Sequence, residues 1–161
     1  MSDSQPIVLG LDVGTQSLRA ALVDLSGKTL AYGVEPIETT YPRPAWAEQR
    51  PQDWWQAAKS ATRKALAASG IAPARVAAIG LDCTACTVVA CTLDGEPLRP
   101  SLLWMDQRAH AEAEEISATG DPVLKYVSGR VSPEWMLPKS LWLTRNEPET
   151  YERAERLVEC T

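Results

Sequence analysis

The stretch that decides the fold is Ile7-Val-Leu-Gly-Leu-Asp-Val-Gly-Thr-Gln-Ser-Leu-Arg-Ala-Ala-Leu-Val-Asp24. An apolar run from Ile7 to Leu11 ends in Asp12, a turn of small and polar residues follows, and a second apolar run begins at Leu18. Apolar runs of this length around a short turn predict a β-hairpin. Its tip carries a carboxylate, a glycine and several hydroxyl or amide side chains.

Such a tip can bind the phosphate groups of a nucleotide. Gly14 lets the backbone approach a ligand, and backbone N–H groups together with the hydroxyls of Thr15 and Ser17 can donate hydrogen bonds to phosphate oxygens. Asp12 can hold the magnesium ion that accompanies the phosphates. The same residue types are common in ordinary hairpin turns, so local chemistry leaves both interpretations open. The sequence contains neither a Gly-x-x-x-x-Gly-Lys-Ser/Thr loop nor a Gly-x-Gly-x-x-Gly loop.

Length and composition predict one soluble globular domain. The chain has 161 residues, of which 45% are hydrophobic and 23% charged, as is usual for globular proteins. A net charge of −5 argues against a nucleic-acid partner. The apolar runs are too short to span a bilayer, and the N-terminus lacks the basic and apolar regions of a secretion signal. We therefore expect a cytoplasmic protein without a membrane partner.

The cysteine content fits that compartment. Cys83 and Cys86 form a C-x-x-C pattern, which is typical of zinc or redox sites; the other cysteines are Cys91 and Cys160. A zinc site would need further ligands, and the only histidine is His110. A redox motif would lie at the start of a helix, whereas these residues follow an apolar run that predicts a strand. We therefore interpret the pair as small, partly buried side chains.

Periodicity predicts alternating strands and helices along the chain. Strands are expected at about 6–12, 18–25 and 28–38 as an antiparallel meander, followed by a helix at 52–69 that ends at Gly70. The apolar run 76–81 lacks alternation and predicts a buried strand. The helix is expected to bury one face, formed by Trp54, Ala58, Ala61, Ala65 and Ala68. Further on, we expect a strand at 87–93, an apolar run at 100–104, and helical segments at 107–117, from 121, at 139–146 and at 149–156.

Two further clusters carry polar chemistry. Asp82 and Ala85 follow the expected strand 76–81, where loops of α/β folds bind ligands. Without further context, a strand-end turn that satisfies the Asp82 side chain is the favoured interpretation. In Leu102-Leu-Trp-Met-Asp-Gln-Arg108, the Trp104 ring suits the C–H face of a sugar, and Asp106 and Arg108 suit its hydroxyls or a phosphate. The alternative is a helix start with Asp106 as the cap and Trp104 in the core.

Taken together, these motifs resemble a known family. Asp-x-Gly-Thr between two strands resembles the first phosphate motif of the actin-like ATPase superfamily, and Asp12 to Arg19 resembles the opening of the FGGY carbohydrate kinases. In those kinases a Trp-x-Asp-x-Arg segment like 104–108 lines the sugar site. Segments 82–87 and 126–143 resemble the ribulokinase group, whereas the strings typical of glycerol kinases and xylulokinases are absent. The resemblance runs from Ile7 to about Cys160.

The resemblance implies an α/β, ribonuclease-H-like domain with a mixed sheet and flanking helices. It implies ATP-dependent phosphorylation of a sugar hydroxyl, with a ketopentose such as ribulose as the substrate, ATP and Mg²⁺ as cofactors, and Asp12 as the metal ligand. The residues expected at the nucleotide are Asp12, Gly14, Thr15, Gln16, Ser17 and Arg19. Those expected at the sugar are Asp82, Ala85, Cys86, Trp104, Asp106, Arg108 and Glu134, with Lys139 as a further candidate.

The resemblance also implies that the chain is incomplete. Kinases of this type have two domains, and we expect residues 1–161 to be part of the N-terminal, sugar-binding domain. The C-terminal nucleotide domain and the aspartate that acts as general base are expected beyond residue 161, so this chain alone should not complete the reaction. The alternative is a non-catalytic nucleotide- or sugar-binding module on the same fold, or a kinase relic. The sequence does not determine which sugar, or which stereoisomer of it, is the substrate. It also leaves the oligomeric state open, with a homodimer as one alternative.

Overall fold

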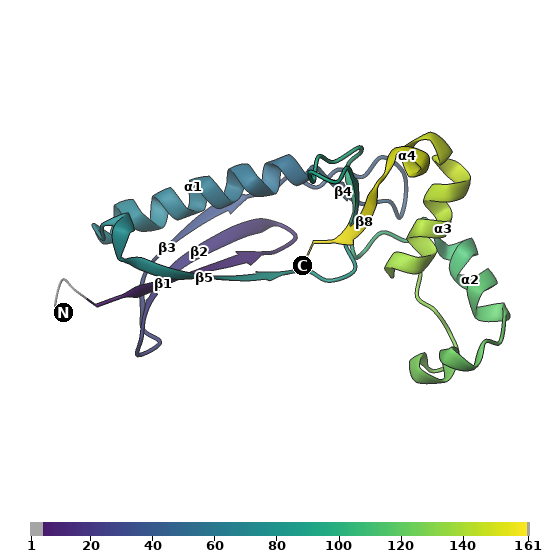
Figure 1. Cartoon of the computed structure of the whole chain (residues 1–161), viewed down its shortest axis with the longest axis horizontal. Coiled ribbons are helices and arrows are strands. Elements are labelled where there is room, and N and C mark those ends of the chain that lie inside the picture. Colours follow the sequence, from purple (N-terminus) through teal and green to yellow (C-terminus); the bar gives the residue numbers. More distant parts are fainter. Residues whose placement is uncertain (1–4, 161) are drawn as a thin grey trace. The chain divides into compact units, whose positions relative to one another are not determined.

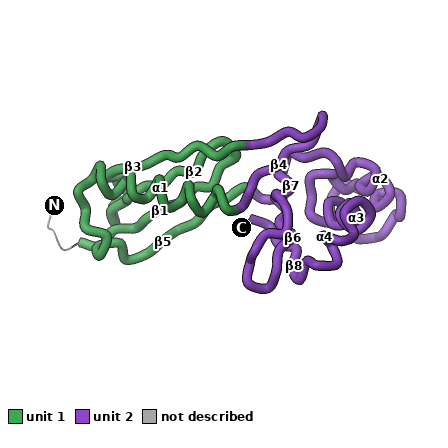
Figure 2. The backbone as a smooth tube through the Cα atoms, turned by 90° about the horizontal axis from the view of Figure 1, so that it is seen from above, with its two compact units in different colours: residues 1–38, 52–84, 161 green, residues 39–51, 85–160 purple. Residues whose placement is uncertain are grey.

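The computed structural model describes residues 5–160, and these divide into two compact units (Figure 2). The first unit holds the residues up to Glu38 together with Gln52–Thr84, and the second holds Thr39–Pro51 together with Ala85–Cys160. Within the described residues no helix combines the length and the apolar run that a bilayer crossing requires.

The first unit is built on a mixed sheet with the strand order β3-β2-β1-β5 (Figure 1). β1 (Ile7–Val13) pairs antiparallel with β2 (Ser17–Asp24), which pairs antiparallel with β3 (Thr29–Pro36). β5 (Val76–Cys83) pairs parallel with β1. The 3₁₀ turn η1 (Pro73–Arg75) leads into β5. The predicted meander and the strand after the helix are therefore confirmed.

Helix α1 (Pro51–Ser69) lies along one face of this sheet (Figure 1). Its buried side chains are Ala57, Ala61 and Ala65, so Ala57 belongs to the buried face whereas the predicted Ala68 is exposed. The buried alanines are spaced four residues apart, and Ala68, three residues after Ala65, does not continue that spacing. At Gly33 on β3, an added Cβ would lie 2.1 Å from the Ala61 carbonyl oxygen, so the close contact of helix and sheet requires glycine there.

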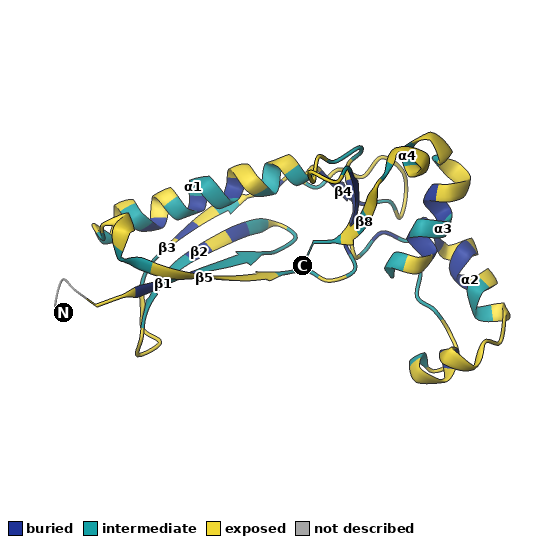
Figure 3. Ribbon diagram, in the orientation of Figure 1, coloured by how far each residue is buried: buried dark blue, intermediate teal, exposed yellow. Residues whose placement is uncertain are grey.

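The prediction that the strand at 76–81 is buried was wrong for the described residues. Ile79 and Leu81 are 66% and 63% exposed, and Figure 3 shows β5 as largely exposed. β5 lies at the edge of the sheet that residues 5–160 form. The buried core under α1 is formed by residues of β1, β2 and α1 together with Ile37. From β5 only the partly buried Val76 packs against it, so Ile79 and Leu81 lie outside the core.

The second unit combines a small antiparallel sheet with helices. The sheet has the order β4-β7-β6-β8, formed by β4 (Glu48–Gln49), β7 (Ser101–Leu102), β6 (Val88–Cys91) and β8 (Arg156–Glu159). The helices are α2 (His110–Ala118), η2 (Pro122–Val127), α3 (Met136–Asn146) and α4 (Pro148–Arg153). Their core is Val88, Leu102, Ala109, Trp142 and Leu143.

Three boundaries differ from the predictions in this unit. The helix expected from 107 begins at His110, because residues 106–108 form a hydrogen-bonded turn. The helix expected from 139 begins at Met136 and holds Pro138 in its first turn, where a proline costs no helical hydrogen bond. The helix expected to reach 156 ends at Arg153, and the next residues form β8.

Candidate functional site

The tip of the β1–β2 hairpin joins a carboxylate to a guanidinium. Asp12 and Arg19 are register partners on the two strands, and Arg19 Nη1 donates a hydrogen bond of 2.8 Å to Asp12 Oδ2. Both side chains are about half exposed, so the pair is open to a ligand. The Gly14 N–H donates to the Ser17 carbonyl oxygen over 3.1 Å, which closes the turn that carries Thr15 and Gln16.

Glycine is required at position 14 by the packing around it. A Cβ there would lie 3.1 Å from Arg19 Nη1 and 3.2 Å from the Ser17 carbonyl oxygen, closer than most real Cβ contacts. A Cβ at this position would therefore require the Arg19 guanidinium and the turn backbone to shift by a few tenths of an ångström. The sequence assigns Gly14 to the close approach of a ligand. Gly14 also leaves room for the ion pair between Asp12 and Arg19.

A second carboxylate lies beside the first. Asp82 on β5 is the parallel register partner of Asp12, so the two residues occupy the same level of neighbouring strands and face the same side of the sheet. Together with Arg19 and Tyr32 they line an open cavity of about 600 Å³, whose floor includes Gly10. No group of three potential metal ligands gathers anywhere in residues 5–160. The carboxylates of Asp12 and Asp82 suit an ion bound through one or two carboxylates, as Mg²⁺ on a nucleotide is.

In the second unit, Trp104 lies just beyond β7, after Leu103. Its indole is 39% exposed, and its backbone N–H donates to Thr87 Oγ1 over 3.2 Å. This bond ties the Trp104 segment to the residues just before β6. Trp104 is thus at the surface of the unit, and the alternative that placed it in the core does not describe it.

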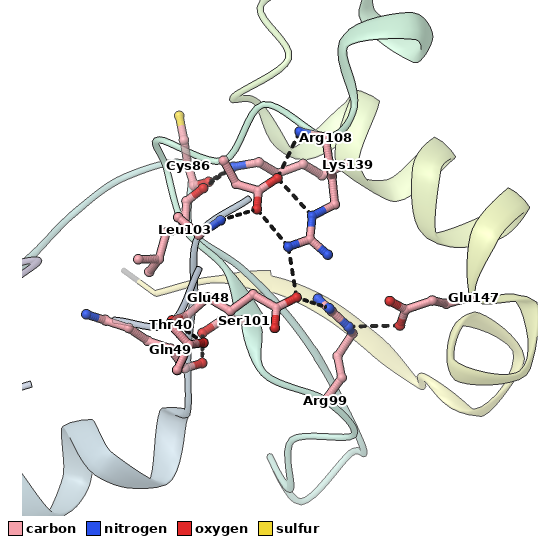
Figure 4. A network of polar contacts seen from close by, with 12 residues as sticks. Thr40, Glu48, Gln49, Cys86, Arg99, Ser101, Leu103, Arg108, Lys139 and Glu147 are labelled. Carbon is pink, nitrogen blue, oxygen red and sulfur yellow. Dashed lines mark hydrogen bonds and ion pairs between the residues drawn. The ribbon is translucent and has the colours of Figure 1, made fainter. Parts of the chain in front are cut away.

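Asp106 and Arg108 are buried and form one network (Figure 4). Arg108 donates from Nε to Asp106 Oδ1 over 2.9 Å and from Nη2 to Asp106 Oδ2 over 2.7 Å. Asp106 Oδ2 also accepts from the Ala47 N–H at 2.7 Å, and Arg108 Nη2 lies 2.8 Å from Glu48 Oε1. The guanidinium lies 3.8 Å from the ring centre of Trp46. These contacts connect residues 106–108 to the segment around β4.

Lys139 is fully buried and bridges two backbone segments. Its Nζ donates to the carbonyl oxygens of Cys86 and Leu103 over 2.8 and 2.7 Å (Figure 4). Burial lowers the pKa of Lys139 from 10.5 to about 8, because removal from water disfavours the charged ammonium, and the Asp106 carboxylate offsets part of that effect.

Cys86 sits at the centre of these contacts. Its N–H donates to Glu159 Oε2 over 3.2 Å. Burial raises the pKa of the Cys86 thiol, and the Glu159 carboxylate raises it further, which opposes thiolate chemistry. Cys83 and Cys86 belong to different units, and the cysteines among the described residues are free thiols. Glu159 gave no signal in the sequence, because its partner lies 73 positions away.

Glu134 joins the second group through Gln107. The Gln107 Nε2 donates to Glu134 Oε1 over 3.0 Å, so the loop before α3 contacts the turn after Trp104. Ala85 is exposed at the start of the same unit. The predicted residues thus form one group on the hairpin unit, with Asp12, Arg19 and Asp82, and one on the second unit, with Cys86, Trp104, Asp106, Arg108 and Glu134.

Comparison with known proteins shows the family of the chain. Residues 7–160 match the FGGY family of carbohydrate kinases, N-terminal domain. The chain belongs to the FGGY family. A D-ribulokinase of Saccharomyces cerevisiae is 36% identical over 86% of the chain, and a ribulokinase of Geobacillus thermodenitrificans is 36% identical over 96% of it. These matches confirm the resemblance to the ribulokinase group.

A solved structure confirms the fold of the FGGY domain. The crystal structure of a xyloylose kinase from Brucella ovis superimposes with a TM-score of 0.88 at 30% identity and covers 95% of the chain. The chain spans 21% of the length of the yeast relative, 32% of the Geobacillus relative and 32% of the Brucella kinase. The α/β, ribonuclease-H-like prediction, with a mixed sheet and a flanking helix, is therefore confirmed.

Proposed function

We propose that the protein carrying this FGGY domain transfers the γ-phosphoryl group of ATP to a hydroxyl of a ketopentose such as ribulose. The observation that carries the proposal is the arrangement at the hairpin tip, where Asp12, held by Arg19, lies in register with Asp82. The names of the ribulokinase relatives support the substrate class. We further propose that residues 1–161 form part of the N-terminal, sugar-binding domain of a longer kinase, and that the general base lies outside them.

The hairpin tip supplies the phosphate side of the reaction. Phosphoryl transfer is catalysed mainly by positioning and by neutralising negative charge. A magnesium ion bound with ATP would neutralise phosphate charge, and Asp12 is the residue proposed to hold it. The hydroxyls of Thr15 and Ser17 and the turn backbone would donate hydrogen bonds to phosphate oxygens. Arg19 keeps the Asp12 carboxylate in one orientation through their 2.8 Å bond.

The second unit supplies the sugar side. The exposed part of the Trp104 indole can pack on the C–H face of a sugar, and the Glu134 carboxylate can accept a hydrogen bond from a hydroxyl. Asp106 and Arg108 are buried, so we propose that they orient the Trp104 segment from the interior of the unit and do not contact the sugar themselves. Asp82 and Ala85 are exposed, and we propose that both contact the substrates.

The test is a coupled ADP-release assay on the full-length protein. It should be supplied with Mg²⁺-ATP and a panel of D-ribulose, L-ribulose, D-xylulose and glycerol. We expect ADP release that depends on a ribulose isomer. Asp12→Asn should lower kcat by about 100-fold or more, whereas Asp94→Asn, a matched change in an exposed turn, should have no effect.

Two results would contradict the proposal. Absence of sugar-dependent ADP release with every sugar would exclude the kinase function. Binding of ATP or sugar without turnover, measured by calorimetry, would then favour the non-catalytic module. Equal turnover by Asp12→Asn and the wild-type protein would contradict the role given to Asp12.

A further inference from the structure

Cys86 adopts an unusual backbone conformation. Its φ is +61°, in the left-handed region that residues with a Cβ rarely enter. Glycine would occupy this region without strain, yet the chain carries a cysteine here. A residue held in this conformation needs surrounding contacts that fix it, and such residues gather at functional sites.

Those contacts come from two charged side chains on different elements. The Cys86 N–H donates to the carboxylate of Glu159 on β8 at 3.2 Å, and the Cys86 carbonyl oxygen accepts from the ammonium of Lys139 on α3 at 2.8 Å. The Glu159 carboxylate therefore lies at the backbone N–H of Cys86, and the Lys139 ammonium lies at its backbone carbonyl oxygen. Hydrogen bonds to charged groups are stronger than those between neutral groups, so both ends of Cys86 are firmly bound.

The same contacts extend to Trp104. Lys139 Nζ also donates to the Leu103 carbonyl oxygen at 2.7 Å, so a single ammonium joins residue 86 to residue 103 (Figure 4). Next to this bridge, Thr87 Oγ1 accepts from the Trp104 N–H at 3.2 Å. Segment 85–87 and segment 103–104 are thus joined at two adjacent points.

We propose that Glu159 and Lys139 are positioning residues that hold Cys86 in its left-handed conformation and thereby fix segment 85–87 against Trp104. The sugar would meet the Trp104 ring and the exposed Ala85, whose relative placement depends on this clamp. The inference rests on the proposed function, because it assigns these segments to a sugar. Glu159 contributes through Cys86, without contacting the substrate.

The chain offers a matched control for Glu159. Glu155, just before β8, accepts a hydrogen bond from the Leu93 N–H through Oε2 at 2.8 Å, which is the same kind of carboxylate–amide contact. Leu93 is not among the residues with positive φ, and it lies in the turn that follows β6. Glu159→Leu and Glu155→Leu therefore remove similar bonds, of which only one belongs to the clamp.

The experiment measures steady-state kinetics of the full-length kinase. Glu159→Leu should raise KM for the sugar by about tenfold, the size expected when a strained residue is released, and leave KM for ATP within about twofold. Glu155→Leu should change neither constant. Adding Cys86→Gly to Glu159→Leu should restore most of the sugar KM, because glycine takes the left-handed conformation without help. Adding Cys86→Ala, which keeps the Cβ, should not.

The outcomes separate this inference from the proposed function. If the wild-type protein phosphorylates no sugar, the proposed function fails first. If it is active and Glu159→Leu leaves the sugar KM unchanged, or if Cys86→Ala restores it as well as Cys86→Gly does, the positioning role is wrong and the kinase function stands. Amide exchange at Cys86 gives a second readout, and it should be faster in Glu159→Leu than in Glu155→Leu.

Discussion

Replacing Lys139 with methionine should change how the stability of the protein depends on pH. The Lys139 ammonium is fully buried, and that burial lowers its pKa from 10.5 to about 8. The ionisable groups around it are Asp106, Cys86, Glu134 and Glu159. Since Cys86 is itself ionisable and burial raises the pKa of its thiol, the comparison is best made between Cys86→Ala and Cys86→Ala with Lys139→Met.

The sign follows from which state holds the proton. Below about pH 8 the lysine is charged in both the folded and the unfolded chain, so the full cost of burying the charge is present. Between about 8 and 10.5 the folded chain has released the proton and the unfolded chain has kept it, so stability rises with pH. Over the whole shift the cost is about 3 kcal/mol, of which about 2 kcal/mol is relieved between pH 8 and 10. A neutral amine keeps two N–H donors, enough for both carbonyl oxygens.

The measurement is urea unfolding at intervals from pH 7 to 10. Relative to the methionine variant, the protein with lysine should gain about 2 kcal/mol from pH 8 to 10. Other titrating groups are common to both proteins and cancel in the difference. Parallel stability curves would refute the reasoning, because they would mean that Lys139 titrates equally in the folded and unfolded states.

Three further substitutions test the packing and the hairpin tip. Gly33→Ala would place a Cβ 2.1 Å from the Ala61 carbonyl oxygen and should lower the free energy of unfolding, measured in urea, by about 3 kcal/mol or more. Gly80→Ala is the control: a Cβ there meets no atom within 4 Å, so the free energy of unfolding should stay nearly unchanged. Asp106→Asn would remove one of the two carboxylates that pair with the buried Arg108 guanidinium and should lower the unfolding free energy by about 1.5–3 kcal/mol; a loss under about 1 kcal/mol would show that the network is dispensable. Gly14→Ala should raise KM for ATP several-fold in the full-length kinase while KM for the sugar stays constant, and an unchanged ATP constant would exclude the tip from nucleotide binding.

The hairpin unit was predictable because its signals are local. Alternating apolar runs, the polar turn at 12–17 and the glycine stop at position 70, where φ is +66°, each specify structure within a few residues. The exposure of β5 was not predictable, because it depends on how many neighbouring strands and helices cover that edge. A run such as 76–81 has the same composition whether or not it is covered.

The second unit was harder because its sheet is made of distant pieces. β8 exists by pairing Val88 with Glu159 and Cys91 with Arg156, more than 60 positions apart in the chain. Taken alone, residues 156–159 continue the helical pattern before them. For the same reason the sequence did not indicate Glu159 as a candidate site residue. Its contact with Cys86 joins residues that are 73 positions apart, and its neighbours in sequence give no sign of that contact.

Asp106 and Arg108 show that a sequence motif can single out residues without indicating how each side chain is placed. The spacing Trp-x-Asp-x-Arg would place all three side chains on one face if the segment were extended. The segment turns instead: the Asp106 N–H donates to the Leu103 carbonyl oxygen at 2.9 Å, and the Asp106 carboxylate accepts from the Arg108 N–H at 3.0 Å. The turn directs Trp104 outward and the charged pair inward, toward Glu48. We therefore propose that the charged residues of this motif act through the shape that they give the segment, a role that only the contacts across the fold could reveal.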